Sequence, residues 1–282
     1  MTRKILRNVG VPVLSLVLLL GLWQAIVVGF NVAPYVAPRP WQAILSVTQN
    51  WSTIWPLALG TIRETVYGFL IGAALGVFLG VVMAKVPVLQ RSVYPVLVLS
   101  QAVPIIALAS PLVLILGFSI MPKIVIVAWI VFFPVTVNVV DGLSHVDADL
   151  INLARVYGAP RWRTFVHIEM PATTTPLFSG LKIGATYAVT GAVIGELAAS
   201  EGSSLALYQE HANSNLNAAA VYGTTMVMTA IGISWFLLVI AAEVAATPWQ
   251  RRSIARRYPW RRARSEGDGT ASIVSSLSKG ES

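Results

Sequence analysis

Residues Asp147 to Pro171 read DADLINLARVYGAPRWRTFVHIEMP and form the longest polar segment inside the 282-residue chain. The segment has too many charges to cross a membrane, yet its apolar residues recur too regularly for a linker. Helical spacing predicts a first amphipathic helix with Leu150, Leu153, Ala154 and Tyr157 on one face. Gly158 is a typical helix stop, and a second short helix is predicted with Trp162, Phe165 and Ile168 on one face and its end at Pro171.

The composition around this segment is that of a membrane protein. Hydrophobic residues make up 56% of the chain and charged residues 11%, whereas an ordinary soluble domain has about 25% charged residues. Four blocks contain no Asp, Glu, Lys or Arg, namely 9–30, 65–84, 92–121 and 212–242. A membrane span needs about 20 apolar residues, so the chain is predicted to cross the bilayer several times.

We predict six transmembrane helices, at about 9–30, 57–84, 92–117, 122–142, 178–199 and 222–246. Helices are expected because lipid offers no partner to free backbone groups, and the alternating pattern of a β-barrel is missing. The predicted fold class is therefore an all-α polytopic membrane protein. Its parts are expected to be a short N-terminus (1–8), a membrane domain (9–250) with a polar loop (143–176), and a tail (251–282) that is basic and then disordered.

The positive charges predict the orientation. With the N-terminus inside, 17 Lys and Arg residues face the cytoplasm, and Arg39, Arg63 and Lys123 face the exterior. The positive-inside rule then places both termini in the cytoplasm and residues 200–221, which lack Lys and Arg, outside. Seven arginines lie between Arg251 and Arg264; their expected partner is the anionic inner leaflet of the lipid membrane and not nucleic acid.

Glycines mark one face of the span at 57–84. Gly68, Gly72, Gly76 and Gly80 recur every four residues, so a neighbouring helix can approach closely there. Packing within one bundle is the expected role of this face. A subunit interface or a pathway lining is the alternative.

Prolines mark the span at 92–117. Pro95, Pro104 and Pro111 each remove a helix hydrogen bond, and a broken helix at membrane depth needs shelter from protein or from a wet cavity. We therefore predict that the stretch from Gln101 to Pro111, with Pro104 and Ser110, walls a substrate pathway. A kinked packing helix is the alternative.

Charged residues inside spans are costly and mark functional sites by default. Glu196, near the outer end of the span at 178–199, is predicted to act in the pathway or at a gate; a structural carboxylate that reaches the interface is the alternative. Arg63 and Glu64 are expected to anchor the outer end of the span at 57–84. The spans lack a cluster of Lys or Arg, which favours a neutral or zwitterionic small solute.

The polar segment resembles the signature loop of the permease family of bacterial binding-protein-dependent ABC importers, in which Glu-Ala-Ala is followed by Gly and then by Leu-Pro. Asn152, Leu153 and Ala154 stand at the triplet, Gly158 and Ala159 match the glycine and its neighbour, and Met170 and Pro171 match the end. Asn152 lacks the charge of the family glutamate, and Asp147 or Asp149 is the candidate replacement. Further similarity lies in PYVAPRPWQAI, QAVPIIALASP, SGLKIGATYAVTGAVIGELAASEG and Pro248-Trp249.

This resemblance covers nearly the whole chain and implies a MetI-like ABC importer permease fold. The subgroup that it most resembles serves nitrate, sulfonates, taurine and pyrimidine precursors of thiamine, so a thiamine-precursor pyrimidine or a sulfonate or taurine-like compound is the expected solute. The loop is implied to form cytoplasmic coupling helices that sit in a groove of an ATPase. The implied contact residues are Asn152, Leu153, Ala154, Tyr157, Gly158, Ala159, Trp162 and Pro171.

The resemblance also implies the rest of the assembly. Two ABC ATPase subunits dock in the cytoplasm, an extracytoplasmic binding protein delivers the solute, and a second permease copy forms a homodimer. The implied location is the bacterial cytoplasmic (inner) membrane. The chain is expected to bind no cofactor or metal, because ATP and Mg²⁺ belong to the ATPase.

Two other classes of protein fit the sequence less well. An ion-coupled secondary transporter commonly shows inverted repeats and paired intramembrane acids, and no convincing repeat is present. An enzyme is not expected, because the sequence contains no H-E-x-x-H, no G-x-S-x-G and no phosphate-binding G-x-x-x-x-G-K-[ST] motif.

Overall fold

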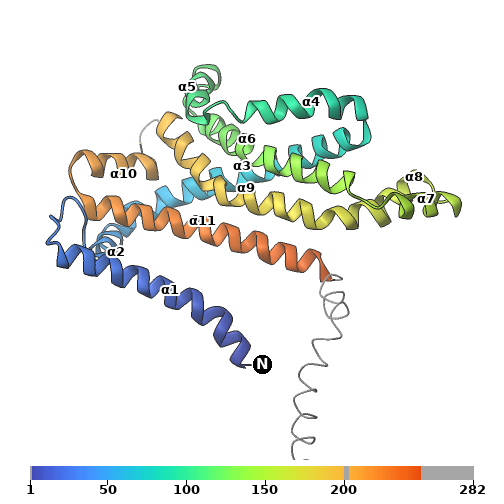
Figure 1. The fold of residues 1–282 in the computed structure, drawn as a ribbon. Coiled ribbons are helices and arrows are strands. Elements are labelled where there is room, and N and C mark those ends of the chain that lie inside the picture. Colours follow the sequence, from blue (N-terminus) through green and yellow to red (C-terminus); the bar gives the residue numbers. More distant parts are fainter. Residues whose placement is uncertain (1, 200–202, 249–282) are drawn as a thin grey trace, which may run out of the picture. The chain divides into compact units, whose positions relative to one another are not determined.

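The computed structural model describes residues 2–199 and 203–248. Every regular element in these residues is a helix (Figure 1), which confirms the all-α fold class. The described residues up to 239 form one compact unit, and the predicted tail at 251–282 lies outside the described residues. The helices are α1 (Thr2–Gly29), α2 (Pro40–Gln49), α3 (Trp51–Lys85), α4 (Pro87–Ser100), α5 (Ile105–Leu116), α6 (Ile120–Ser144), α7 (Ala148–Val156), α8 (Arg161–Thr164), the π-helical turn η1 (Phe165–Glu169), α9 (Met170–Ala199), α10 (Leu205–Ser214) and α11 (Ala218–Ala246).

Several of these helices are long and apolar enough to cross a membrane. Among the described residues there are four, namely α3, α6, the continuous helix Arg161–Ala199 and α11, and five if α4 and α5 count as one bent span. The first predicted span lies within α1, where the apolar stretch Leu18–Gly29 is shorter than a full span. A multi-pass membrane protein is therefore confirmed.

The predicted proline-broken span is bent sharply. Helices α4 and α5 meet at an angle of 98° across residues 101–104. Pro104 has an extended backbone and precedes the first turn of α5, where a missing N–H costs nothing because the first four helical N–H groups have no partner within the helix. Pro95 and Pro111 lie inside α4 and α5, so the break occurs at one of the three prolines.

Helix α6 packs between α3 and α9. The glycines of α3 abut α6 so closely that a methyl group at Gly72 would lie 2.4 Å from the carbonyl oxygen of Ala128. On the other side, a methyl group at Gly180 of α9 would lie 2.7 Å from the carbonyl oxygen of Pro134. Small residues on both flanks therefore bring three backbones together, as is typical where van der Waals packing drives helix association.

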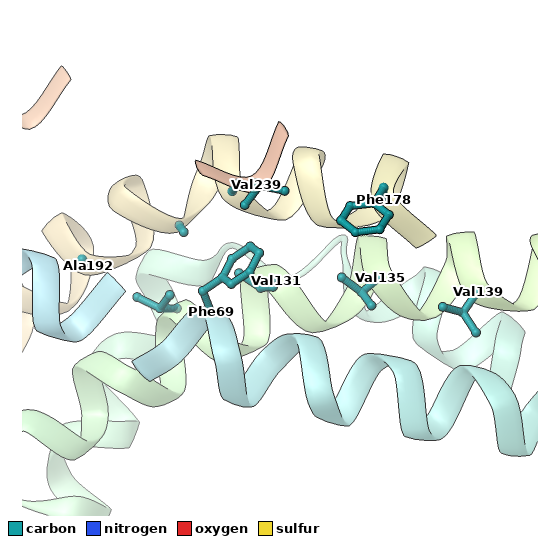
Figure 2. Packing of buried hydrophobic residues seen from close by; sticks show 10 residues of the cluster. Phe69, Val131, Val135, Val139, Phe178, Ala192 and Val239 are labelled. Atoms are coloured by element: carbon teal, nitrogen blue, oxygen red, sulfur yellow. The ribbon is translucent and has the colours of Figure 1, made fainter. Parts of the chain in front are cut away.

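Between these glycine contacts lies an apolar core (Figure 2). Phe69 of α3 lies beside Val131 of α6, and Phe178 of α9 lies beside Val135 of α6. The ring of Phe69 also meets Trp235 of α11 edge to face, with centroids 5.2 Å apart. This core holds α3, α6 and α9 as one framework from which the polar segment projects.

Two helices lie where none was predicted. Helix α2 begins at Pro40, and the Gln42 side chain accepts a hydrogen bond from the Arg39 N–H at 2.9 Å. Helix α10 lies in the predicted external segment 200–221 and begins after Ser204, whose hydroxyl accepts from the Leu207 N–H at 3.2 Å. Both are only 10 residues long, so a search for membrane-length apolar runs misses them, although their first residues carry helix-start signals.

The second short helix of the polar segment is not separate, and Pro171 does not end it. Residues from Arg161 onward run without interruption into α9. The turn before Pro171 is widened, because the Met170 N–H donates to the Phe165 carbonyl five residues back. A widened turn makes room for the proline ring, which otherwise clashes with the carbonyl four residues earlier.

Candidate functional site

The polar segment forms helix α7, a glycine turn and helix α8. Asp147 precedes α7, and its side chain accepts the Asp149 N–H at 2.9 Å. At the other end the Gly158 N–H donates to the Arg155 carbonyl and the Ala159 N–H donates to the Ala154 carbonyl, both at 2.9 Å. This paired pattern is a Schellman motif. It requires the left-handed backbone of Gly158, whose φ is +73°.

This segment presents large apolar side chains that the described chain leaves at least half exposed. Helix α7, the turn and α8 carry five of them, which we call the docking face: Leu150 (50%), Leu153 (53%), Val156 (83%), Tyr157 (82%) and Trp162 (71%). Soluble surfaces rarely carry such a contiguous apolar patch unless it binds a partner. The docking face lies at the end of α9 that is remote from α10 (Figure 1).

Contacts between the end of α3 and η1 connect the docking face to the framework of α3, α6 and α9. The Lys85 ammonium at the end of α3 donates to the Glu169 carboxylate, of which only 9% is exposed. The same ammonium lies 5.1 Å from the ring centroid of Phe165, within the range of a cation–π contact. Because Phe165 and Glu169 belong to η1, α3 is joined to the turn that continues into α9.

The residues that the family resemblance assigns to coupling lie in two places. Leu153, Tyr157 and Trp162 lie on the docking face, Gly158 forms its turn, and Asn152 accepts a hydrogen bond from Arg155 at 3.4 Å. Ala154 and Ala159 supply backbone groups to the turn. Pro171 lies inside the long helix beyond η1 and outside the turn.

A cavity of about 510 Å³ lies between α5, α6 and α9. Its polar lining consists of amides and hydroxyls, from Gln101, Asn138, Tyr187 and Thr190, and Phe133 supplies an aromatic wall. Among the predicted pathway residues, Gln101 lines this cavity, whereas Pro104 and Ser110 are exposed on the bent segment. No charged side chain is among the described residues of its lining.

Glu196, the remaining predicted pathway residue, is buried in a polar cluster. It is 1% exposed, so it does not reach toward the interface. Its carboxylate accepts the Thr61 hydroxyl at 2.5 Å and the backbone N–H of Ala206 at 2.8 Å. Ala206 lies in the first turn of α10, where free N–H groups favour a carboxylate. Glu196 thus joins α9 to α3 and to α10.

Glu64 and Lys123 extend this cluster and were missed as a pair. The expectation that Glu64 anchors the membrane interface is wrong, because it is 4% exposed and lies 3.0 Å from the Lys123 ammonium of α6. The second oxygen of Glu64 is buried without a hydrogen-bond donor among the described residues. An acid inside one predicted span and a base at the start of another was the available signal, since charges in spans tend to pair.

Comparison with known proteins places these features in one family. Residues 72–251 match the family model described as binding-protein-dependent transport system inner membrane component. The formylaminopyrimidine transport permease protein ThiX of Halalkalibacterium halodurans is 30% identical over 245 residues, which cover 86% of this chain and 96% of that protein. The riboflavin transport system permease protein RibX of Chloroflexus aurantiacus is 32% identical over 197 residues, which cover 67% of this chain and 71% of that protein.

Proposed function

The chain belongs to the family of binding-protein-dependent transport system inner membrane components, and from this premise we propose how it couples to its ATPase and which solute it carries. It is a transmembrane permease subunit of an ABC importer, and an ion-coupled secondary transporter is not favoured. Membership of this ABC permease family implies an ATPase and a substrate-binding protein as partners.

The docking face is the proposed contact with the ATPase. The observation that carries this proposal is the exposure of Val156, Tyr157 and Trp162, each more than 70% exposed, at and beside a turn fixed by the Schellman motif. Burial of large apolar side chains stabilises a complex by roughly 25 cal/mol per Å² of surface removed from water. A rigid turn also favours binding, because it loses little conformational freedom when the complex forms.

Cross-linking tests this contact. The chain has no cysteine, so Val156→Cys provides a single reactive thiol on the docking face. In membranes that contain the importer, Val156→Cys is expected to cross-link to the ATPase subunit. Leu216→Cys, a position 70% exposed in the connection between α10 and α11, is the matched control and is expected not to. Equal cross-linking from both positions would count against the docking face.

The assembly proposed around this contact has two copies of the permease and two ATPase subunits. ATP and Mg²⁺ are proposed to bind the ATPase subunits, and the binding protein to deliver solute on the outer side of the bacterial inner membrane. Both termini are proposed to be cytoplasmic, as the positive-inside rule predicts.

The proposed solute is a small, uncharged, planar heteroaromatic compound. The cavity between α5, α6 and α9 offers amides, hydroxyls and an aromatic wall, which are the groups that orient such a molecule. Lys123, the cation at the start of α6, is already paired with Glu64. Names of two relatives, the formylaminopyrimidine and riboflavin permeases, point in the same direction. A sulfonate would leave its charge without a cation among the described lining residues.

Uptake measurements test the solute class. Vesicles that contain the complete importer are expected to accumulate a labelled aminopyrimidine in an ATP-dependent manner and to ignore an aliphatic sulfonate. Tyr187→Leu, in the cavity, is expected to reduce this uptake several-fold, whereas Tyr67→Leu, which is as exposed as Tyr187 but lies on α3 away from the cavity, is expected to leave it unchanged. Uptake of sulfonate alone would overturn the proposed solute class.

A further inference from the structure

A second cavity lies beside the docking face and is lined by basic side chains. Its volume is about 480 Å³, and its walls come from the end of α3, from α7 and from the α8–η1 turn. Trp162 belongs both to the cavity wall and to the docking face, so a partner that covers the docking face also reaches the cavity.

The charges of this cavity do not balance among the residues that the structure describes. Lys85, Arg155 and Arg161 line it together with one acid, Glu169, and Lys85 already pairs with Glu169. Arg155 contacts the neutral amide of Asn152. Among the residues that the structure describes, neither Arg155 nor Arg161 forms an ion pair. Two positive charges therefore remain for a ligand.

Helix α7 and the turn that follows it carry negative charge at one end and positive charge at the other. Asp147 and Asp149 stand at the start of α7 and are exposed, whereas Arg155 and Arg161 flank its end and the turn. Asn152, between them, is neutral. This pattern differs from a uniformly basic surface, since an anionic bilayer that approached the arginines would be repelled by the two aspartates.

We propose that the basic cavity receives a carboxylate side chain of the ATPase subunit. The inference rests on the proposed docking of that subunit at the docking face. An aspartate or glutamate is the protein group that matches a guanidinium, because a carboxylate can accept two parallel hydrogen bonds from it. The permease thus recognises its ATPase by charge as well as by shape. An ATPase without an acid at this place docks poorly.

Reversing the charge of Arg161 tests the proposal. In the complete permease, reconstituted in nanodiscs, Arg161→Glu is expected to weaken binding of the ATPase subunit about tenfold or more. The substitution is compatible with folding, because Arg161 is the first residue of the long helix and acids are favoured there. Arg163→Glu is the matched control, since Arg163 is exposed on the same turn but does not line the cavity, and it is expected to leave the affinity unchanged.

The partner acid is then found by rescue. Lysine replacements of the surface acids of the ATPase are combined with Arg161→Glu, and one of them is expected to restore most of the lost affinity. Equal affinities of the unmodified permease and Arg161→Glu would overturn the proposal. A second result would also overturn it. If no lysine replacement restores ATPase binding to the Arg161→Glu permease, and this permease has lost as much affinity for vesicles of anionic phospholipid, the cavity is a lipid site.

Leu153→Asp separates this inference from the docking proposal. If Leu153→Asp abolishes ATPase binding and Arg161→Glu does not change it, the docking face stands and the carboxylate inference fails. If Leu153→Asp has no effect on binding, the docking proposal itself fails and the carboxylate inference fails with it.

Discussion

Lys123 and Glu64 neutralise each other at a place where either charge alone would be costly. Their charged atoms lie 3.0 Å apart, and both side chains are largely buried. Glu196 beside them is satisfied differently, by a hydroxyl and a helix N-terminus. At the scale of single residues, therefore, the surroundings decide the role of an acid, and identical glutamates serve as an ion-pair partner and as a helix cap.

Lys123→Met is expected to destabilise the permease strongly, because it leaves the Glu64 carboxylate buried without its cation. Removing one partner of a buried pair typically costs about 3–5 kcal/mol of folding free energy. Thermal unfolding of the purified permease in nanodiscs measures the effect. The double variant Lys123→Met with Glu64→Leu is expected to recover a large part of the loss; an equally unstable double variant would contradict this explanation.

Gly158→Val is expected to uncouple ATP hydrolysis from uptake without preventing membrane insertion. A left-handed backbone costs an L-residue about 1–2 kcal/mol, and Gly158 holds that conformation at φ +73° with no atom near its missing side chain. The defect is thus conformational and not steric. Gly158→Asn, which tolerates this backbone, is expected to retain most uptake. Normal uptake by the valine variant would remove the turn from the mechanism.

Helices are positioned by their smallest residues. Gly68, Gly72, Gly76 and Gly80 recur on the face of α3 that meets α6, and each would clash with α6 if it carried a methyl group. Helix α6 in turn is met from the other side by glycines of α9. At the scale of elements, close backbone contact at glycines adds to the apolar core in holding three helices together.

Gly72→Ala is expected to destabilise the fold by about 1–3 kcal/mol, the usual cost of overpacking, because its methyl group would lie 2.4 Å from a backbone oxygen. Gly60→Ala is the matched control on the same helix, where no atom lies within 4 Å of the added methyl group. It is expected to be neutral or slightly stabilising. Thermal unfolding of both variants provides the comparison, and similar losses from both would show that helix packing is not the cause.

Sequence patterns predicted the long helices and the glycine turn, but not the course of the chain at Pro171 or the buried ion pair. Apolar runs located α3, α6, α9 and α11 because a bilayer imposes a minimum length on a span. The glycine at position 158 was predicted as a stop because helices so often end at a residue with positive φ. The prediction that a helix ends at Pro171 was wrong, because a proline that would stop a regular helix is accommodated after a π-helical turn. The Glu64–Lys123 pair depends on how α3 and α6 pack, which spacing along one helix does not reveal.

At the scale of the whole molecule, the long helix connects two differently built regions. Arg161–Ala199 is a continuous helix of 39 residues, with the docking face at its beginning and Glu196 near its end. Helix α10 is held at that far end through Ala206. The proposed orientation places the docking face in the cytoplasm and α10 outside. A reagent that cannot cross the membrane therefore reaches each region from one side only.

Thiol labelling checks this orientation. In membranes that contain the permease without its ATPase, Val156→Cys is expected to react with a membrane-impermeant maleimide only in inside-out vesicles, and Leu216→Cys only in intact spheroplasts, because the two positions lie at opposite ends of the membrane helices and both are well exposed. The absence of native cysteines makes the background low. Labelling of Val156→Cys from the outside would reverse the topology and remove the ATPase from the docking face.

The widened turn at Phe165–Glu169 has a mechanical consequence. A helix of 39 residues is about 58 Å long at 1.5 Å per residue, and we expect it to bend most easily where its hydrogen bonds change from a four-residue to a five-residue spacing. Lys85 holds this section against α3 through Glu169 and Phe165. A displacement of Trp162 by a bound partner is therefore expected to tilt the helix about the contact with Lys85.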